Sequence, residues 1–280
     1  MAESTPPDTR TDMETITSAD GTEIAFERTG SGPPLVLVHG ASIDHRYWEH
    51  SGVRPTLAEH CTVYAMDCRG HGESEHPDEF ELEAEFEDVA AVVESIDEPV
   101  TLLGESGGAF YSLEAALRIE NLNGLILHEP AFAADGDGLD IDDEVAEITA
   151  LLDDGENERA TVVFLEKIAQ LTPEELELLR ADPTWPEYVD VFVETVVPKL
   201  EAEAESGYEF DPERFADVTT PTLLLVGTES AQWLEETTRA VDDALSNSRI
   251  VTLDGHGHEA NITAPERFTD EVLTFVRESN

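Results

Sequence analysis

Short, almost continuous apolar runs alternate with longer amphipathic segments along this chain, and this alternation constrains the fold more than any other feature. The apolar runs are Pro34–Gly40, Cys61–Asp67, Val100–Ser106, Leu122–Pro130, Pro221–Gly227 and Arg249–Gly255. Strands that are buried on both faces of a parallel sheet have this composition. The amphipathic segments repeat apolar residues at helical spacing, most clearly over 87–96, 110–119, 233–245 and 265–279. The pattern predicts an α/β protein, with a mostly parallel sheet and helices on both faces.

Two parts of the chain depart from this rhythm. Residues 14–30 alternate polar and apolar positions around a turn at Asp20-Gly21, which predicts a β-hairpin and brings the expected sheet to eight strands. Residues 132–215 contain helical patterns without a convincing strand, so we expect a helical cap inserted after the sixth strand. The expected division is a disordered tail at 1–13, a core formed by 14–131 and 216–280, and a cap at 132–215.

The charge balance is extreme, with 64 Asp and Glu residues against 15 Lys and Arg residues and a formal net charge of −49. The acidic residues are spread between apolar positions along the whole chain, as on the solvated faces of folded helices rather than in a disordered tail. The composition resembles that of cytoplasmic proteins from halophiles that accumulate salt, because salt screens the repulsion between carboxylates. This charge argues against nucleic acid as a partner.

Nothing in the sequence indicates export or membrane insertion. The first residues lack the basic and apolar regions of a signal peptide, and no apolar run is long enough to cross a bilayer. Cys61 and Cys68 offer neither a disulfide framework nor the spacing of a zinc site. We therefore expect a cytoplasmic protein with a small-molecule substrate and no membrane partner, and the sequence gives no indication of oligomeric state.

One serine lies where a nucleophile is expected. Gly104-Glu105-Ser106-Gly107-Gly108 follows an expected buried strand and precedes an expected helix. A strand, a sharp turn and a helix in this order form a nucleophile elbow, in which small residues let neighbouring backbones pass the serine. The alternative is a serine that caps the helix after a glycine turn. We interpret Ser106 as the nucleophile.

An acyl-transfer site also needs donors for the developing oxyanion. The stretch His39-Gly40-Ala41 directly follows the first of the six apolar runs. In a strand, elbow and helix arrangement, the donors are the backbone N–H of the residue after the nucleophile and one from the loop after this early strand. The expected oxyanion hole is therefore formed by the backbones of Ala41 and Gly107.

A general base is expected on the loop that follows the last strand. This loop, Gly255–Asn261, carries His256 and His258, and His128 is the one other histidine after Ser106 in the sequence. A base has to sit at the carboxyl edge of the sheet on a segment that can aim its imidazole. We take His258 as the base because it lies deepest in the loop, and His256 as a spacer.

With these motifs in view, the chain resembles the α/β-hydrolase fold family over about residues 14–131 and 215–280. Besides the elbow and the His-Gly pair, the stretch Asp67-Cys68-Arg69-Gly70-His71-Gly72-Glu73-Ser74 is similar to the D-x-R-G-x-G-x-S signature of many members. The resemblance implies a triad of Ser, acid and His in that chain order, with no cofactor and no metal.

The acid departs from the common pattern of the family. Many members carry an Asp in a G-x-x-D turn after the penultimate strand, and this chain has Ser230 at that position. Two carboxylates are candidates: Glu229, one residue earlier, and Glu129, at the end of the strand after the elbow helix. We favour Glu129, because a strand end followed by Pro130 positions a side chain more accurately than a loop does. Glu229 is expected to cap the next helix.

Together these residues predict a serine hydrolase. Ser106 would attack an acyl carbon, His258 would move the proton, and Glu129 would orient the imidazole. An ester or a related acyl compound is the expected substrate, with specificity from the cap and from residues 42–48, whose aromatic side chains either line the mouth of the pocket or pack in the core. Hydrolysis of a carbon–carbon bond, or a cofactor-free perhydrolase, would use the same triad, and a non-catalytic binding protein would need the pocket alone. Dehalogenation and epoxide opening are disfavoured, since they require a carboxylate nucleophile.

Overall fold

Eight strands form one sheet at the centre of the structure, a computed structural model that describes residues 13–41, 43–134 and 141–280. The strands are β1 Met13–Thr17, β2 Glu23–Gly30, β3 Pro34–Val38, β4 Thr62–Met66, β5 Val100–Glu105, β6 Leu122–His128, β7 Thr222–Gly227 and β8 Ser248–Leu253. Their order in the sheet is β1-β2-β4-β3-β5-β6-β7-β8. β2 runs antiparallel to β1 and β4, and all other neighbours are parallel. The predicted eight-stranded, mostly parallel sheet is confirmed.

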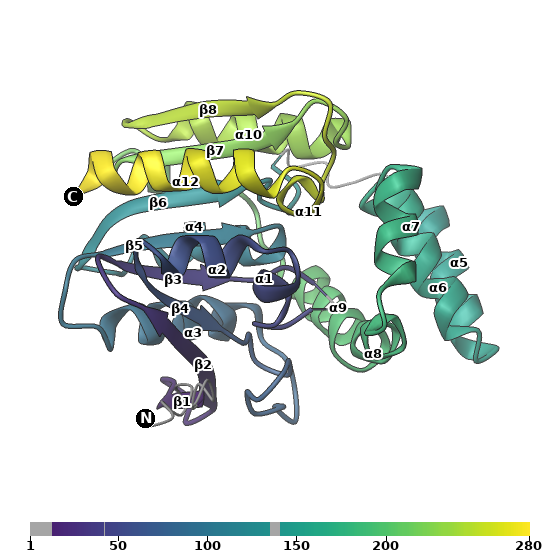
Figure 1. The fold of residues 1–280 in the computed structure, drawn as a ribbon. Coiled ribbons are helices and arrows are strands. Elements are labelled where there is room, and N and C mark those ends of the chain that lie inside the picture. The colour runs from purple at the N-terminus through teal and green to yellow at the C-terminus, as the bar shows by residue number, and fades with distance from the viewer. Residues whose placement is uncertain (1–12, 42, 135–140) are drawn as a thin grey trace, which may run out of the picture.

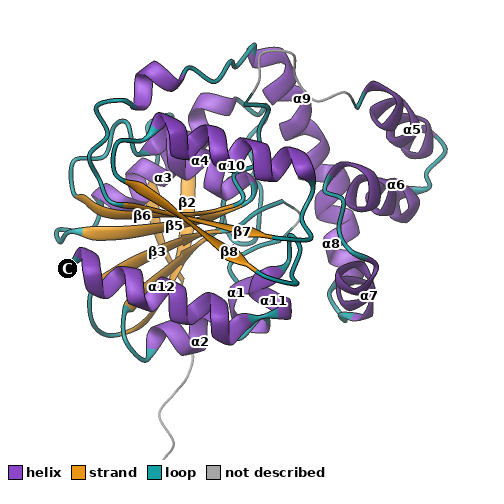
Figure 2. Cartoon of the chain, turned by 90° about the horizontal axis from the view of Figure 1, so that it is seen from above, coloured by secondary structure: helices purple, strands orange, loops and turns teal. Residues whose placement is uncertain are grey.

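Helices cover both faces of this sheet (Figures 1 and 2). One face carries α2 Val53–Ala58 and α12 Pro265–Ser279, and the other carries α3 Leu82–Glu94, α4 Gly107–Ala115 and α10 Gln232–Ala244. The short helices α1 Tyr47–His50 and α11 Ala260–Thr263 lie in loops. Successive side chains of β3 enter two different apolar clusters, Leu35 and Leu37 on one face and Val36 and Val38 on the other. This double burial explains why the strands read as continuous apolar runs.

Between β6 and β7, every described element is helical. These elements are α5 Asp142–Asp153, α6 Asn157–Val163, the π-helical turn η1 Phe164–Ile168, α7 Pro173–Ala181, α8 Trp185–Val191, the π-helical turn η2 Phe192–Val196, α9 Val197–Ser206 and the 3-10 helix η3 Pro212–Phe215. Figure 1 shows α5 to α9, which we call the cap helices, beside the end of the sheet toward which the parallel strands point. The cap after the sixth strand is thus confirmed. None of the described helices is long and apolar enough to cross a bilayer.

The expected boundaries of core and cap stay a prediction, but packing shows where the two meet. Leu151, Ile168 and Phe192 belong to one apolar cluster of cap residues, against which Ala41 of the core also packs. Phe215, at the end of η3, packs instead in the cluster of the core. The predicted disordered tail lies outside the described residues except for Met13, which begins β1.

Candidate active site

Ser106 sits on a strained turn between β5 and α4. Its backbone has φ 53° and ψ −119°, a conformation that is rare and unfavourable for a residue with a side chain. Two backbone hydrogen bonds hold the turn: Ser106 N–H donates to His128 O at 2.9 Å, and Ala131 N–H donates to Ser106 O at 3.2 Å. A Cβ at Gly104 would lie 2.4 Å from the carbonyl oxygen of Gly108. The glycines on both sides therefore permit the close backbone crossing that a nucleophile elbow requires.

The structure brings Ser106, His258 and Glu129 into one line of polar contacts. Nε2 of His258 lies 3.1 Å from Oγ of Ser106, and Nδ1 lies 2.5 Å from Oε2 of Glu129. Ser106 directly follows β5, Glu129 directly follows β6, and His258 lies on the loop after β8. In the tautomer with the proton on Nδ1, the ring donates to the carboxylate and accepts the serine proton. Such a line can transfer a proton from the serine to the imidazole.

Glu129 is held by groups besides His258. Its other oxygen, Oε1, accepts hydrogen bonds from the Gly227 N–H at 2.7 Å and from the Ser230 hydroxyl at 2.5 Å. Glu129 is fully buried and has a positive φ of 48°, whereas Glu229 is exposed. Of the two candidate acids, the structure places Glu129 at the imidazole. Ser230, at the position where many relatives carry the acid, supports that carboxylate instead.

Burial and pairing shift the pKa values of this line. Burial opposes ionisation of Glu129, but the hydrogen bond and the charge of His258, with the Gly227 N–H, outweigh it and lower the pKa of the carboxyl to about 2. Burial also opposes protonation of His258, but the hydrogen bond and the charge of Glu129 raise the pKa of the imidazole above its ordinary range. The arrangement therefore favours an ionised Glu129 and stabilises the imidazolium that forms during proton transfer.

Both segments expected to supply oxyanion donors lie beside the serine. The backbone at Gly40 passes so closely that a Cβ there would be 3.1 Å from Cβ of Ser106, and Ala41 is the next residue. Gly107 is the first residue of α4, and the first N–H groups of a helix have no partner within it. The assignment of Ala41 and Gly107 as donors stays a prediction that this placement favours.

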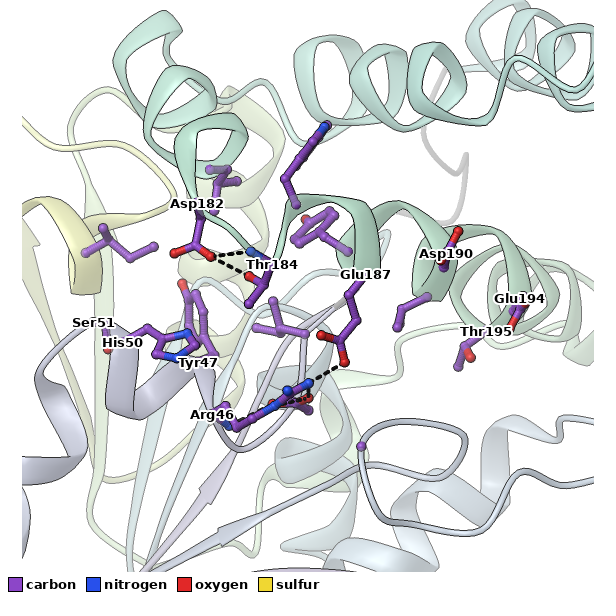
Figure 3. Close-up of a pocket in the computed structure, with 18 of the residues that line it drawn as sticks. Arg46, Tyr47, His50, Ser51, Asp182, Thr184, Glu187, Asp190, Glu194 and Thr195 are labelled. Atoms are coloured by element: carbon purple, nitrogen blue, oxygen red, sulfur yellow. Dashed lines mark hydrogen bonds and ion pairs between the residues drawn. The ribbon is translucent and has the colours of Figure 1, made fainter.

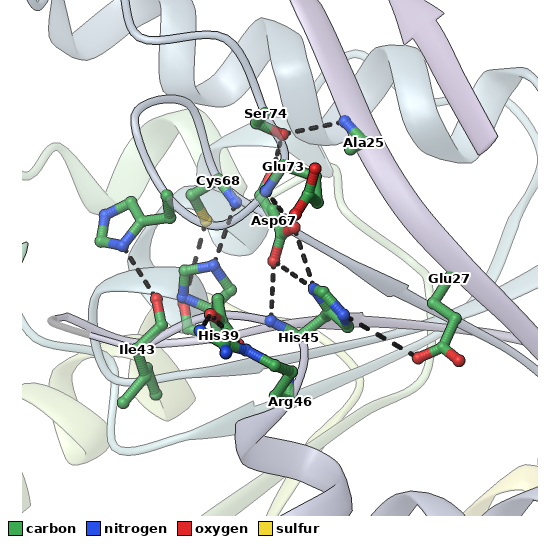
Figure 4. A network of polar contacts seen from close by, with 12 residues as sticks. Ala25, Glu27, His39, Ile43, His45, Arg46, Asp67, Cys68, Glu73 and Ser74 are labelled. Carbon is green, nitrogen blue, oxygen red and sulfur yellow. Dashed lines mark hydrogen bonds and ion pairs between the residues drawn. The ribbon is translucent and has the colours of Figure 1, made fainter. Parts of the chain in front are cut away.

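The loop that carries Ala41 is tied to the loop after β4 (Figure 4). The Asp67 carboxylate accepts hydrogen bonds from the His45 N–H at 2.7 Å and from the Glu73 N–H at 2.9 Å, and it contacts Nδ1 of His45 at 2.9 Å. Nε2 of His39 accepts from the Cys68 N–H at 3.0 Å. The stretch that resembles the D-x-R-G-x-G-x-S signature thus shapes the loop beside Ser106.

Part of this network has donor atoms of the kind that bind metals. Asp44, His45 and Asp67 each offer one ligand atom, and these atoms lie within 4.8 Å of one another. The Asp67 carboxylate is already engaged by backbone N–H groups, and the Asp44 carboxylate accepts from the Arg46 guanidinium at 2.9 Å. These contacts account for the side chains, so we assign no metal to them.

The other two histidines that follow Ser106 are placed differently from His258. His128 is fully buried, and within the described residues neither of its ring nitrogens has a hydrogen-bond partner. Burial lowers its pKa to about 4, so this ring is neutral and packs beside the His258 ring, 6.1 Å between centroids. Nδ1 of His256 lies 2.9 Å from Oγ1 of Thr263. His256 therefore contacts α11 rather than Ser106, and its interpretation as a spacer stays a prediction.

A cavity of about 500 Å³ lies between the loop after β3 and the cap helices α7 and α8 (Figure 3). Tyr47 lines it, while Trp48 is fully buried in the core and Ser42 lies outside the described residues. The Arg46 guanidinium pairs with Glu187 of α8 across this cavity. Of the two aromatic residues in the stretch 42–48, Tyr47 lines this pocket and Trp48 packs in the core, and Ile43, Asp44 and Arg46 of the same stretch line the pocket as well. Ser106, Glu129 and His258 are not among the residues that line it.

Two buried glutamates at the site were not predicted from the sequence. Glu105 is 2% exposed, and its Oε1 lies 3.7 Å from Nε2 of His258; burial raises its pKa. The sequence feature that could have indicated Glu105 is its position as a charged residue at the end of an apolar run. Glu175 of the cap is 1% exposed and accepts a hydrogen bond from the Glu259 N–H at 2.8 Å. The capping-box spacing of Thr172 and Glu175 was visible, but nothing local in the sequence indicated this distant contact.

Known proteins resemble this chain over most of its length. The family model described as the alpha/beta hydrolase family matches residues 35–271. A 2-hydroxy-6-oxo-6-(2'-aminophenyl)hexa-2,4-dienoic acid hydrolase of Metapseudomonas resinovorans is 26% identical, with 94% of this chain and 91% of that protein covered. A pimeloyl-[acyl-carrier protein] methyl ester esterase of Aeromonas hydrophila is 28% identical, with 90% and 99% covered. An alpha/beta hydrolase of Sphaerobacter thermophilus with a crystal structure is 31% identical, with a TM-score of 0.72 and 91% and 99% covered.

Proposed function

Because the chain belongs to the alpha/beta hydrolase family, we propose that it is a serine hydrolase that cleaves an ester or a related acyl compound. The observation that carries the proposal is the line from Ser106 through His258 to Glu129, with contacts of 3.1 and 2.5 Å. The relative from Aeromonas hydrophila, which is named as a methyl ester esterase, supports the substrate class. A serine hydrolase uses a nucleophile, a base and an orienting acid that contact one another in such a line.

In the first half of the reaction, Oγ of Ser106 attacks the acyl carbon while Nε2 of His258 takes the hydroxyl proton. The ionised Glu129 stabilises the resulting imidazolium and keeps its ring in place. The N–H groups of Ala41 and Gly107 donate to the negative oxygen of the tetrahedral intermediate. As the intermediate collapses, the imidazolium gives its proton to the leaving alcohol, and an acyl-serine remains.

In the second half, water replaces the alcohol. Nε2 of His258 takes a proton from the water, and the water oxygen attacks the acyl-serine to form a second tetrahedral intermediate. The imidazolium then returns the proton to Oγ of Ser106, which leaves, and the carboxylic acid is released. Every proton passes through one nitrogen, so the reaction needs no further acid or base.

A fluorophosphonate probe tests this proposal in molar KCl. The probe should label the wild-type protein at Ser106, and labelling should be lost in Ser106→Ala and reduced to a slow residual rate in His258→Ala. His256→Ala is the matched control, because its side chain contacts Thr263 rather than Ser106, and it should label as the wild type does. Undiminished labelling of His258→Ala would remove the base from the mechanism. A panel of esters and thioesters then identifies the preferred acyl group.

Hydrolysis of a carbon–carbon bond is a second candidate. The relative from Metapseudomonas resinovorans favours it, because that protein is named as a hydrolase of a hexadienoic acid and aligns with 94% of this chain. The same serine and histidine would act on a carbonyl carbon, with a carbon rather than an oxygen leaving group. Incubation with a 2-hydroxy-6-oxo-dienoic acid distinguishes the candidates, since release of a carboxylic acid from it without turnover of any ester favours this second reaction.

A further inference from the structure

Glu175 belongs to the cap, but its carboxylate reaches the loop that carries His258. Oε2 accepts hydrogen bonds from the N–H and the hydroxyl of Thr172, at 2.8 and 2.9 Å, and so closes a capping box at the start of α7. Oε1 accepts a hydrogen bond from the Glu259 N–H at 2.8 Å. In an ordinary capping box the glutamate serves its own helix. Here it joins the first turn of a cap helix to the backbone directly after His258.

The same carboxylate also packs against the residue before His258. A Cβ at Gly257 would lie 2.6 Å from Oε2 and 2.8 Å from Oε1 of Glu175, so a side chain at position 257 would displace the carboxylate. The glutamate is 1% exposed, which protects its hydrogen bonds from competition by water. Glu175 therefore contacts the chain on both sides of His258: it packs against Gly257 and accepts a hydrogen bond from the Glu259 N–H.

The core holds other parts of this loop. The Gly255 N–H donates to Oγ1 of Thr228 at 2.8 Å, and the Tyr47 hydroxyl donates to the Glu259 side chain. Neither contact involves the backbone N–H of Glu259. The core also holds the loop through the Glu229 N–H, which donates to His256 O at 2.9 Å. The contact from the cap thus adds a restraint at a backbone group that these core contacts do not engage, next to the residue whose imidazole has to meet Ser106.

On the basis of the proposed function, we infer that Glu175 is a positioning residue that couples the docked cap to the general base. By holding the Glu259 N–H, it fixes the backbone on which His258 stands. A displacement of a catalytic group by about 1 Å lowers a rate by about 100-fold. When α7 moves away from the core, this contact is lost, and the imidazole loses its accurate placement. The cap then controls the rate of the chemical step in addition to the binding of substrate.

Steady-state kinetics of Glu175→Gln and Glu175→Ala test this inference in molar KCl. An amide at position 175 has one acceptor oxygen, so it cannot accept from Thr172 and Glu259 through separate oxygens. We expect kcat to fall about 10- to 100-fold with KM changed less than about twofold. The control is Glu174→Gln, the same substitution at the exposed neighbouring residue of the same turn, with kcat within about twofold of wild type. A rise in KM at an unchanged kcat would assign Glu175 to substrate binding and overturn the inference.

A spectroscopic measurement separates positioning from general damage. The proton between Nδ1 of His258 and Glu129 should give a low-field ¹H NMR signal in the wild type and in Glu174→Gln, and this signal should broaden or vanish in Glu175→Gln. An unchanged signal in Glu175→Gln would contradict the inference. If Glu175→Ala does not fold, the Gln variant, which conserves shape, carries the test, with its thermal midpoint measured first.

The phosphonate probe keeps this inference separate from the proposed function. If the wild type is not labelled, the proposed function fails whatever the Glu175 variants do. If the wild type is labelled and Glu175→Gln reacts at the same rate, the proposed function stands and the role of Glu175 is refuted. Labelling that is slowed in Glu175→Gln and unchanged in Glu174→Gln supports both.

Discussion

Carboxylates at the active-site edge differ from those on the outer faces of this protein. Glu129 and Glu175 are almost completely buried, and each accepts hydrogen bonds through both of its oxygens. The side chains of Glu235 on α10 and Glu147 on α5 are each 44% exposed, and each pairs with one cationic side chain at the surface. The acidity of the chain therefore serves two purposes. In the proposed mechanism, the buried Glu129 and Glu175 position an imidazole and a loop, whereas exposed carboxylates set a surface charge that salt can screen.

Paired substitutions, each of one buried and one exposed acid, test this difference between the two classes of carboxylate. The largest effect is expected for Glu129→Gln against Glu229→Gln. Loss of the orienting carboxylate should lower kcat by up to about 10⁴-fold with little change in KM, and Glu229→Gln should stay within about twofold. The measurement is kcat for a responsive ester in the same salt. A severe loss in the Glu229 variant alone would assign the acid to the loop after β7.

Ion pairs should show the next largest contrast. Asp88 is 1% exposed and accepts two hydrogen bonds of 2.7 Å from the Arg69 guanidinium. Asp88→Asn leaves the buried Arg69 cation with only the partly exposed Asp20, at 2.9 Å, as a counter-charge, and should lower the free energy of unfolding by up to about 3–5 kcal/mol. Glu235→Gln, in the exposed pair with Arg239, should cost less than about 0.5 kcal/mol. Denaturant unfolding in molar KCl measures both, and equal losses would abolish the distinction.

Salt should act on the exposed acids. Unscreened carboxylates raise the free energy of the compact state more than that of the expanded chain. Removing molar KCl should therefore lower the free energy of unfolding by about 2 kcal/mol or more, and Tm by at least about 4 °C for a domain of this size. Thermal midpoints across a KCl series measure this. A flat series would show that the net charge of −49 is not an adaptation to salt, and with it the predicted halophilic, cytoplasmic origin would lose its support.

The smallest effect is expected from Glu105. His258 has to be neutral to accept a proton, and its raised pKa places the acidic limb of kcat/KM above the ordinary value for histidine. The Glu105 charge contributes to that rise, so Glu105→Gln should move the limb to lower pH. Burial raises the pKa of Glu105 itself, so Glu105 is charged over only part of the pH range of the profile. The expected shift of the acidic limb is therefore modest. Glu98→Gln, an exposed change at the other end of β5, should leave the limb in place, and a limb moved upward by Glu105→Gln would contradict the assignment.

The sheet and the elbow could be predicted from the sequence because their signals are local. Continuous apolar runs report burial on both faces, and the glycines around Ser106 report a crossing that any side chain would block. Glu129 also had a local signal, since it ends a buried strand. His258 was chosen from a loop with two histidines, and its contact with Ser106 agrees with that choice.

The contacts that cross the fold could not be read in the same way. Glu175 lies 84 positions from Glu259 along the chain, and a capping box looks the same whether its second oxygen faces water or another loop. Ser230 occupies the position where the family pattern predicts an Asp. Its hydroxyl donates instead to the carboxylate of Glu129, 101 positions away along the chain. Such contacts depend on where the cap and the loops meet, which tertiary packing decides rather than any local pattern.

The proposed triad requires that Glu129 act through His258 alone, and this requirement can be measured directly. The rate of phosphonylation of Ser106 should be measured in wild type, Glu129→Gln, His258→Ala and the double variant, all in molar KCl. If the acid works by orienting and stabilising the imidazole, its removal has little further effect once the imidazole is gone, so the double variant should react as slowly as His258→Ala. A double variant whose loss equals the product of the two single losses would show that the two residues act independently, and the proposed triad would be wrong.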